Sequence, residues 1–301
     1  MIDSWWRAKP WSAGNDNGLS GVCQVGLHGR TVEIISNNAE ARCFLQFLFG
    51  DLPPQGAPVS GRRFEVLFAG RPARLSLWHD DQQLYFGESP YELATQLVNE
   101  VLYECTVDND SVHALHAAAL NCGGRGIVLP GTSGCGKSSL AALLSASVRG
   151  CAYLTDELAL LASDGTIRAF TRPLALRPAA LGALADHVRL APEACLVGEQ
   201  GAMVPHRCLN PDWNASTPHL DCLIFPHFEA DRPAELIRLS PAQACMQLMG
   251  CQVNARNLAG HGLQALAGLA RQTEAYSLRF GNFKQAFDLL QPILEPPHKH
   301  L

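Results

Sequence analysis

One short stretch of the sequence has the residue types and the spacing of a phosphate-binding loop. It fits the pattern G-x-x-x-x-G-K-[ST] at every fixed position. Its residues are Gly131, Thr132, Ser133, Gly134, Cys135, Gly136, Lys137 and Ser138. In such a loop the glycines let backbone amides wrap around phosphate oxygens, and the positive end of the following helix adds to the attraction. The pattern therefore predicts a site for the phosphates of ATP.

The last residues of this loop have separate expected tasks. Lys137 should reach the β- and γ-phosphates, and Ser138 should offer its hydroxyl to Mg²⁺, a hard cation that prefers oxygen ligands. Ser139 follows directly and is included among the nucleotide-binding residues. The alternative is a glycine-rich turn with an accidental lysine. The residues on either side of the loop argue against this alternative. Residues 125–130 are typical of a buried strand, and residues 138–146 are rich in helix formers.

Two acidic residues, Asp156 and Glu157, follow the next predicted strand, 151–155. A strand, a helix and a second strand predict a right-handed parallel crossover, which places both acids at the carboxyl edge of the sheet near the loop. Transfer of phosphate to a hydroxyl needs a carboxylate that accepts its proton, and the metal needs oxygen ligands. We expect Glu157 and Ser138 to hold the metal. The alternative for the two acids is a solvated strand end.

His116 and Arg172 are further candidates. His116 lies in the apolar segment 114–120, which should form a hairpin with the strand that enters the loop. A lone histidine on an apolar strand is often a core residue, and this interpretation stays open. Arg172 precedes a proline and could grip the transferred phosphoryl group. A lone arginine in such a place is more often a surface residue.

The length of 301 residues favours two domains. Residues 1–105 should form a small α/β module for scaffolding or partner recognition, and residues 106–301 a second domain that contains the phosphate-binding loop. Periodicity predicts helices over 39–49, 91–104, 262–271 and 283–294, and another that begins at Ser240-Pro241. The stretch 189–218 contains many prolines and glycines, which predicts an irregular lid or substrate-binding flap.

The charge and the apolar pattern exclude some function classes. The formal net charge is -5 and the basic residues are scattered, which argues against a nucleic-acid surface. The sequence has no apolar run near the roughly 18 residues of a membrane span. Residues 1–6 lack the charged and apolar pattern of a secretory leader, so we do not expect them to act as one. We therefore expect a cytoplasmic protein that binds neither nucleic acid nor membrane.

The 11 cysteines contain no C-x-x-C pair and lie mostly in apolar runs, which predicts buried, reduced thiols. A structural zinc site is the alternative for part of this set. Its candidate ligands are His206, Cys208, His219, Cys222 and His227, whose spacing matches no standard zinc framework.

The loop, written Gly-x-Ser-Gly-x-Gly-Lys-Ser, resembles that of HPr kinase/phosphorylase and its relatives, and ATP-dependent phosphoenolpyruvate carboxykinases have a similar loop. His116 resembles that family's histidine, and Asp156-Glu157 resembles its paired aspartates. The C-terminal order resembles the HPr-kinase-related kinases of bacterial peptide-modification clusters. Its features are Leu223-Ile224-Phe225-Pro226, the helix at Ser240-Pro241, Asn254 and Ser277-Leu278-Arg279-Phe280-Gly281.

This resemblance covers about residues 111 to 295 and implies an α/β fold. Its core would be a P-loop kinase core of the HPr kinase/phosphoenolpyruvate carboxykinase type with a mixed sheet. It implies an ATP- and Mg²⁺-dependent serine kinase with Asp156 as base, acting on a peptide or small protein, and a possible homo-oligomer. Two alternatives stay open: a nucleotide-binding sensor or partner module without catalysis, and a small-molecule kinase.

Overall fold

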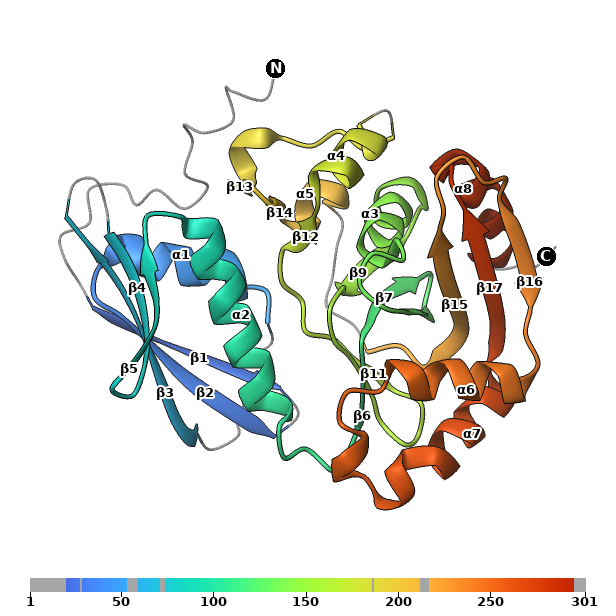
Figure 1. Cartoon of the computed structure of the whole chain (residues 1–301), viewed down its shortest axis with the longest axis horizontal. Helices are drawn as coiled ribbons and strands as arrows, with labels where there is room; N and C mark the ends of the chain where they lie inside the picture. The colour runs from blue at the N-terminus through green and yellow to red at the C-terminus, as the bar shows by residue number, and fades with distance from the viewer. Residues whose placement is uncertain are drawn as a thin grey trace. The chain divides into compact units, whose positions relative to one another are not determined.

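The chain forms two compact units of mixed α/β structure (Figure 1). The computed structural model describes residues 20–27, 29–52, 59–70, 74–185, 187–211 and 217–294. The first unit comprises Met1–Val107, Thr171–Arg177 and Ala191–Pro205, and the second comprises Asp108–Phe170, Pro178–Leu190 and His206–Leu301. The prediction of an α/β fold is therefore confirmed at the level of class.

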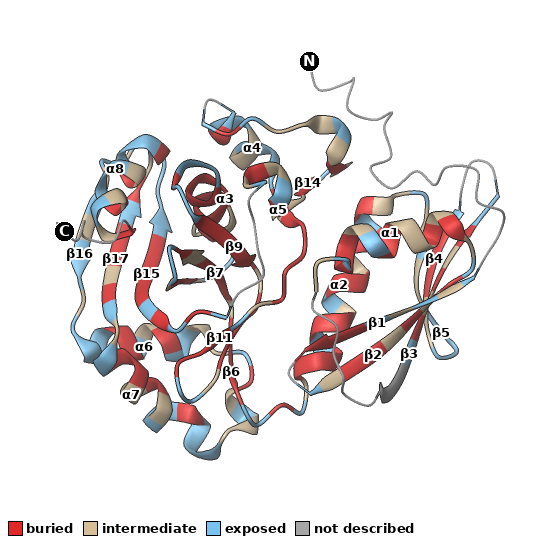
Figure 2. Ribbon diagram, turned by 180° about the vertical axis from the view of Figure 1, so that it is seen from behind, coloured by how far each residue is buried: buried red, intermediate tan, exposed pale blue. Residues whose placement is uncertain are grey.

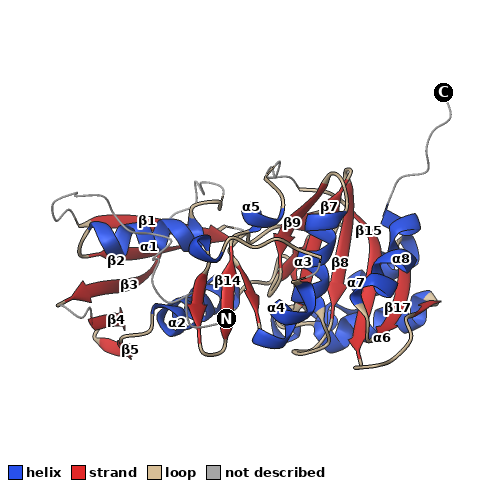
Figure 3. Ribbon diagram, turned by 90° about the horizontal axis from the view of Figure 1, so that it is seen from above, coloured by secondary structure: helices blue, strands red, loops and turns tan. Residues whose placement is uncertain are grey.

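The first unit contains a five-stranded sheet and two helices (Figure 3). Its elements are β1 (Gly21–Leu27), β2 (Arg30–Ser36), α1 (Ala39–Phe49), β3 (Val59–Ala69), β4 (Arg74–His79), β5 (Gln82–Gly87) and α2 (Pro90–Thr106). The strands follow the order β1-β2-β3-β4-β5, and only the β2–β3 pair is parallel, with α1 as its crossover. Both helices begin at side-chain caps, because Asn38 and Ser89 accept hydrogen bonds from the amides of Ala41 and Glu92.

A small antiparallel sheet also belongs to the first unit. It consists of β12 (Leu174–Leu176), β13 (Leu196–Gly198) and β14 (Gly201–Val204) in the order β12-β14-β13. Two of these strands and the short helix α5 (His206–Leu209) fall within 189–218, so the prediction of an irregular stretch is wrong there. Gly198 packs directly on α2, since a Cβ at this glycine would lie 2.5 Å from Cγ of Tyr91. The pairing of β14 with the distant β12 gives this stretch its order.

The second unit is built around a six-stranded mixed sheet. Its elements are β6 (His113–Leu115), β7 (Ala117–Cys122), β8 (Arg125–Pro130), α3 (Lys137–Ser147), β9 (Cys151–Thr155), β10 (Ala159–Leu161), β11 (Ile167–Arg168), α4 (Pro178–Leu184), α5, β15 (Leu220–Phe228), β16 (Glu235–Arg238), α6 (Pro241–Cys251), α7 (Leu263–Gln272), β17 (Glu274–Phe280) and α8 (Phe283–Leu294). The sheet has the order β16-β17-β15-β8-β7-β9. Strands β8, β15 and β17 are parallel, and β7 runs antiparallel to both β8 and β9.

Helices cover both faces of this sheet. Ala117 and Ala119 of β7 belong to a buried cluster with Leu248 of α6 and Leu266 of α7. Since successive strand residues point to opposite faces, α3, which packs on β7, β8 and β9, covers the other face. Buried residues run along β15, β17 and α3 in Figure 2. Among the described helices none is long and apolar enough to cross a membrane.

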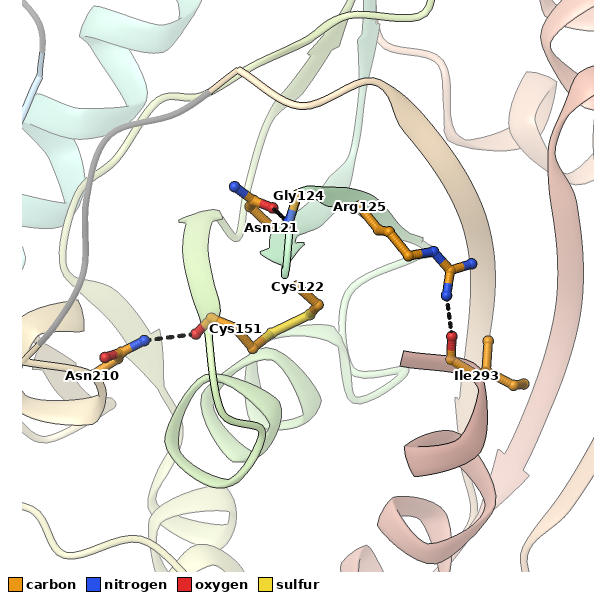
Figure 4. Close-up of a disulfide and its surroundings, with 7 residues drawn as sticks. All are labelled: Asn121, Cys122, Gly124, Arg125, Cys151, Asn210 and Ile293. Carbon is orange, nitrogen blue, oxygen red and sulfur yellow. Dashed lines mark hydrogen bonds between the residues drawn. A yellow bond between two sulfur atoms is a disulfide. The ribbon is translucent and has the colours of Figure 1, made fainter. Parts of the chain in front are cut away.

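A disulfide joins Cys122 at the end of β7 to Cys151 at the start of β9 (Figure 4). The two residues are direct partners in the antiparallel pairing of these strands. All cysteines lie in the described part of the chain, and the other nine form no disulfide there. The prediction of reduced thiols throughout is thus wrong for this pair. The sequence could not show it, because the β7–β9 register brings the two residues together.

This disulfide predicts a simple alkylation pattern. Protein denatured without reductant should take up nine carbamidomethyl groups from iodoacetamide, and all 11 after reduction, as measured by intact mass. A Cys151→Ser variant should expose Cys122 to the reagent before reduction. Uptake at every cysteine of the unreduced wild-type protein would show that the bond is absent.

Asn254 fixes the segment that leads into β6. Its side chain is buried, and its Oδ1 accepts a hydrogen bond from the Ala114 amide over 2.9 Å. Its Nδ2 donates to the carbonyls of Asn109 and Val112 over 2.9 and 2.8 Å. One side chain therefore satisfies three backbone groups of a segment far away in sequence.

We expect Asn254→Ala to lower the free energy of unfolding by about 2 kcal/mol or more, because it leaves buried backbone groups without partners. Urea denaturation measures the change. The matched control is Asn257→Ala, which removes a longer bond of 3.3 Å from a half-buried side chain to the same Asn109 carbonyl. Equal losses in the two variants would contradict the role given to Asn254.

Candidate functional site

Strand direction in the second unit brings the predicted site residues to one edge of the sheet. β8 ends at Pro130 and leads into the loop, and β9, which runs in the same direction, leads into Asp156 and Glu157. β7 runs the opposite way and so begins at this edge, directly after His116. The carboxyl ends of parallel strands are the usual ligand-binding edge of such sheets.

The loop has the backbone conformation that its glycines permit. Gly134 and Gly136 have φ values of 87° and 101°, in the left-handed region. Gly136 is the N-cap residue of α3, and its carbonyl accepts the Leu140 amide over 2.9 Å as the first helical hydrogen bond. The predicted strand, loop and helix are confirmed, with the helix beginning at Lys137.

Lys137 folds back over its own loop. Its side chain is buried, and its ammonium group donates to the carbonyl of Thr132 over 2.9 Å. Burial raises the pKa of the Cys251 thiol, and the charge of Lys137 acts on it in the opposite direction. Cys251 is therefore protonated at neutral pH and unsuited to act as a nucleophile. Lys137 is the cation that the loop itself places at this edge.

The two neighbouring acids have different surroundings. Asp156 is 1% exposed, and its Oδ1 accepts a hydrogen bond of 2.9 Å from the hydroxyl of Tyr153. The Tyr153 ring stacks on His206 with the ring centroids 5.9 Å apart. Glu157 is partly exposed, and its Oε1 lies 3.4 Å from Nε2 of His116. The structure thus brings His116 and Glu157 together and holds Asp156 in a separate, buried position.

His116 lies at a break between two strands, so the prediction that 114–120 is one strand is wrong. The chain changes sheets here, because Ala114 pairs with β10 and Ala117 pairs with β8. The backbone of His116 bridges its neighbours, with its amide donating to Cys251 over 2.8 Å and its carbonyl accepting from Gly131 over 3.2 Å. Its side chain is 30% exposed and faces an acid, which is not the setting of a core histidine.

Arg172 belongs to the first unit, and the loop belongs to the second. Its Nη1 donates to the carbonyl of Pro173 over 2.9 Å, and the side chain is buried. The alternative that Arg172 is an ordinary surface residue is therefore wrong. Its predicted contact with a phosphoryl group stays a prediction.

Oxygen donors at this edge fit a magnesium ion. Mg²⁺ is usually held by one or two protein oxygens together with substrate phosphates. Ser138 follows Lys137 in the first turn of α3, and Glu157 carries a partly exposed carboxylate. In the described part of the chain, no three or more His, Cys, Asp or Glu side chains are grouped to hold a metal, and this includes the five residues considered for zinc.

A phenylalanine cluster beside the loop was not predicted from the sequence. It consists of Phe228 at the end of β15, Phe280 at the end of β17 and Phe283 at the start of α8. The Phe228 amide donates to the Cys135 carbonyl over 3.1 Å. The three phenylalanines come from distant parts of the sequence, and the parallel pairing of β15 with β17 that brings them together is a tertiary feature.

Comparison of the sequence with models of known protein families and with curated proteins found no match. The chemistry therefore has to be inferred from the site. One sheet edge carries a glycine-rich loop with a lysine, two carboxylates and a histidine, which together can bind an anion and accept a proton.

The loop geometry predicts that Gly136→Ala destabilises the protein even without a nucleotide. An alanine at this position would have to keep the positive φ of 101°. Its Cβ would lie 3.0 Å from Cζ of Phe280. We expect the free energy of unfolding to fall by about 1–2 kcal/mol. Thermal or urea denaturation measures this loss.

The matched control is Gly268→Ala in α7, where a Cβ meets no atom within 4 Å. The free energy of unfolding of this variant should rise by about 0.5–1 kcal/mol, because alanine is the better helix former. A Gly136→Ala protein as stable as the wild type would show that the loop tolerates a side chain at this position.

Proposed function

We propose that the protein is an ATP- and Mg²⁺-dependent kinase that transfers the γ-phosphoryl group to a serine or threonine hydroxyl of a peptide or small protein. In this proposal the second unit is a P-loop kinase core of the HPr kinase/phosphoenolpyruvate carboxykinase type. The protein works in the cytoplasm, and a homo-oligomer is compatible with the proposal.

One observation carries the proposal. The phosphate-binding loop and Asp156-Glu157 meet at the same edge of one sheet, because β8 and β9 run in the same direction. A loop alone supports only nucleotide binding. A carboxylate at the same edge supplies the base that transfer to a hydroxyl needs.

Each residue at this edge has its own role in the proposed phosphoryl transfer. The acceptor oxygen bonds to the γ-phosphorus while the bond from this phosphorus to the β,γ-bridging oxygen breaks, and that electron pair leaves with ADP. The acceptor proton passes to the carboxylate of Asp156. Lys137 and the amides of the loop stabilise the negative charge of the phosphates. His116 orients Glu157, from which it is 3.4 Å away.

Mg²⁺ would be held by Ser138 and Glu157 together with the nucleotide, and when bound it would neutralise phosphate charge. The assigned roles leave Asp156 as the proton acceptor. Tyr153 fixes the orientation of that carboxylate through the hydrogen bond from its hydroxyl.

A second candidate function is a nucleotide-binding sensor without catalysis. It is favoured by the burial of Asp156, which is 1% exposed. A carboxylate this deeply buried offers almost no surface to an acceptor hydroxyl in the conformation described. ATP binding without transfer of phosphate to any acceptor would support this second function. Transfer of the γ-phosphate of ATP to a metabolite alone would support a small-molecule kinase.

We expect Asp156→Asn to bind ATP as tightly as the wild type and to transfer phosphate at least about 10²-fold more slowly, the usual range for loss of a general base. Asparagine keeps the shape and can still accept the hydrogen bond from Tyr153. The measurement is transfer from γ-labelled ATP with Mg²⁺ to peptides of a lysate, with binding followed by calorimetry.

The matched control is Asp288→Asn, which removes an exposed carboxylate paired with Lys284 in α8. It should transfer phosphate at the wild-type rate. Lys137→Ala should weaken both ATP binding and transfer. Full activity of Asp156→Asn would exclude the assigned base.

A further inference from the structure

We propose that the ring of Phe228 is the platform for the purine base of the donor nucleotide. The base would lie on the side of the phosphate loop opposite the two acids. This inference rests on the proposed function and adds to it the place of the nucleoside, which no sequence motif indicated.

Phe228 is held directly beside the loop by backbone hydrogen bonds. Its amide donates to the Cys135 carbonyl over 3.1 Å, and the next amide, of Glu229, donates to the Phe280 carbonyl over 2.9 Å. A Cβ at Gly136 would lie 3.3 Å from Cβ of Phe228. The position of Phe228 is therefore fixed with respect to the residues that start helix α3.

The other two phenylalanines support the ring of Phe228 from behind. The Phe228 and Phe283 rings are stacked with centroids 6.0 Å apart, and the Phe228 and Phe280 rings meet edge to face at 5.5 Å. Phe280 and Phe283 are buried, whereas Phe228 is 40% exposed. A large apolar ring is thus kept at the surface by a rigid aromatic support, next to a phosphate site.

The strand order explains why the base belongs on this side. From one side of the sheet to the other, this edge presents Phe280 at the end of β17, Phe228 at the end of β15, the loop after β8, His116 before β7 and Asp156 after β9. The acids and His116 define the side on which the transferred phosphoryl group reacts. A nucleotide that extends across the loop from that group directs its nucleoside towards β15 and β17.

The chemistry of the platform defines the class of ligand. A base that stacks on an aromatic ring gains contact area whatever hydrogen-bonding groups it carries. Each such stacking contact contributes measurably to the binding affinity. Purines offer the larger face. The site should therefore bind purine nucleoside triphosphates. The ring of Phe228 should contribute to binding of the base and not to binding of the phosphates.

The test compares Mg²⁺-ATP with inorganic tripolyphosphate, which has phosphates but no base, by titration calorimetry. Phe228→Ala should weaken ATP binding by roughly tenfold and leave tripolyphosphate binding unchanged. Phe228→Trp keeps an aromatic face and should retain the ATP affinity. The control is Phe86→Ala, which removes another exposed phenylalanine, in the first unit, and should change neither titration.

The other outcomes separate this inference from the proposed function. Unchanged ATP affinity in Phe228→Ala, with both ligands still bound by the wild type, would overturn the platform and leave the kinase proposal standing. Equal loss of both ligands would also overturn it, since Phe228 would then only support the loop. A wild-type protein that binds neither ligand would overturn the proposed function and the platform with it.

Discussion

The parallel hydrogen bonding of β15 with β8 and with β17 is the constraint on which the site depends. It brings the carboxyl ends of three strands to one edge, and the reversed β7 then returns β9 to the same direction as β8. Loop, histidine, acids and phenylalanines share this edge although they come from distant parts of the sequence. Helices on both faces of the sheet bury the strands and leave the edge as the place for ligands.

Gly136 connects three features of this edge. Its left-handed φ of 101° turns the chain from the loop into α3, and its carbonyl accepts the first hydrogen bond of that helix. The missing side chain leaves room for the rings of Phe228 and Phe280. A glycine that a sequence pattern explains by phosphate binding alone is therefore also a packing residue, and the phosphate loop and the aromatic cluster cannot move independently.

The local part of the site could be predicted from the sequence. The strand at 125–130 and the following helix were expected from short-range propensities, and both occur. Features that depend on pairing between distant segments could not be predicted. These are the change of sheet at His116, the disulfide between Cys122 and Cys151, and the pairing of β14 with β12. In each case the partner strand is separated from the feature by residues that carry no pairing signal.

Asp156 and Glu157 show how one strand end can produce two kinds of carboxylate. The first is buried and fixed by the hydroxyl of Tyr153, so it keeps one orientation, as a proton acceptor in a defined geometry must. The second is partly exposed beside His116, a setting that suits the metal-binding role proposed for it. Two adjacent residues thus suit different tasks because the chain turns from the protein interior to the surface between them.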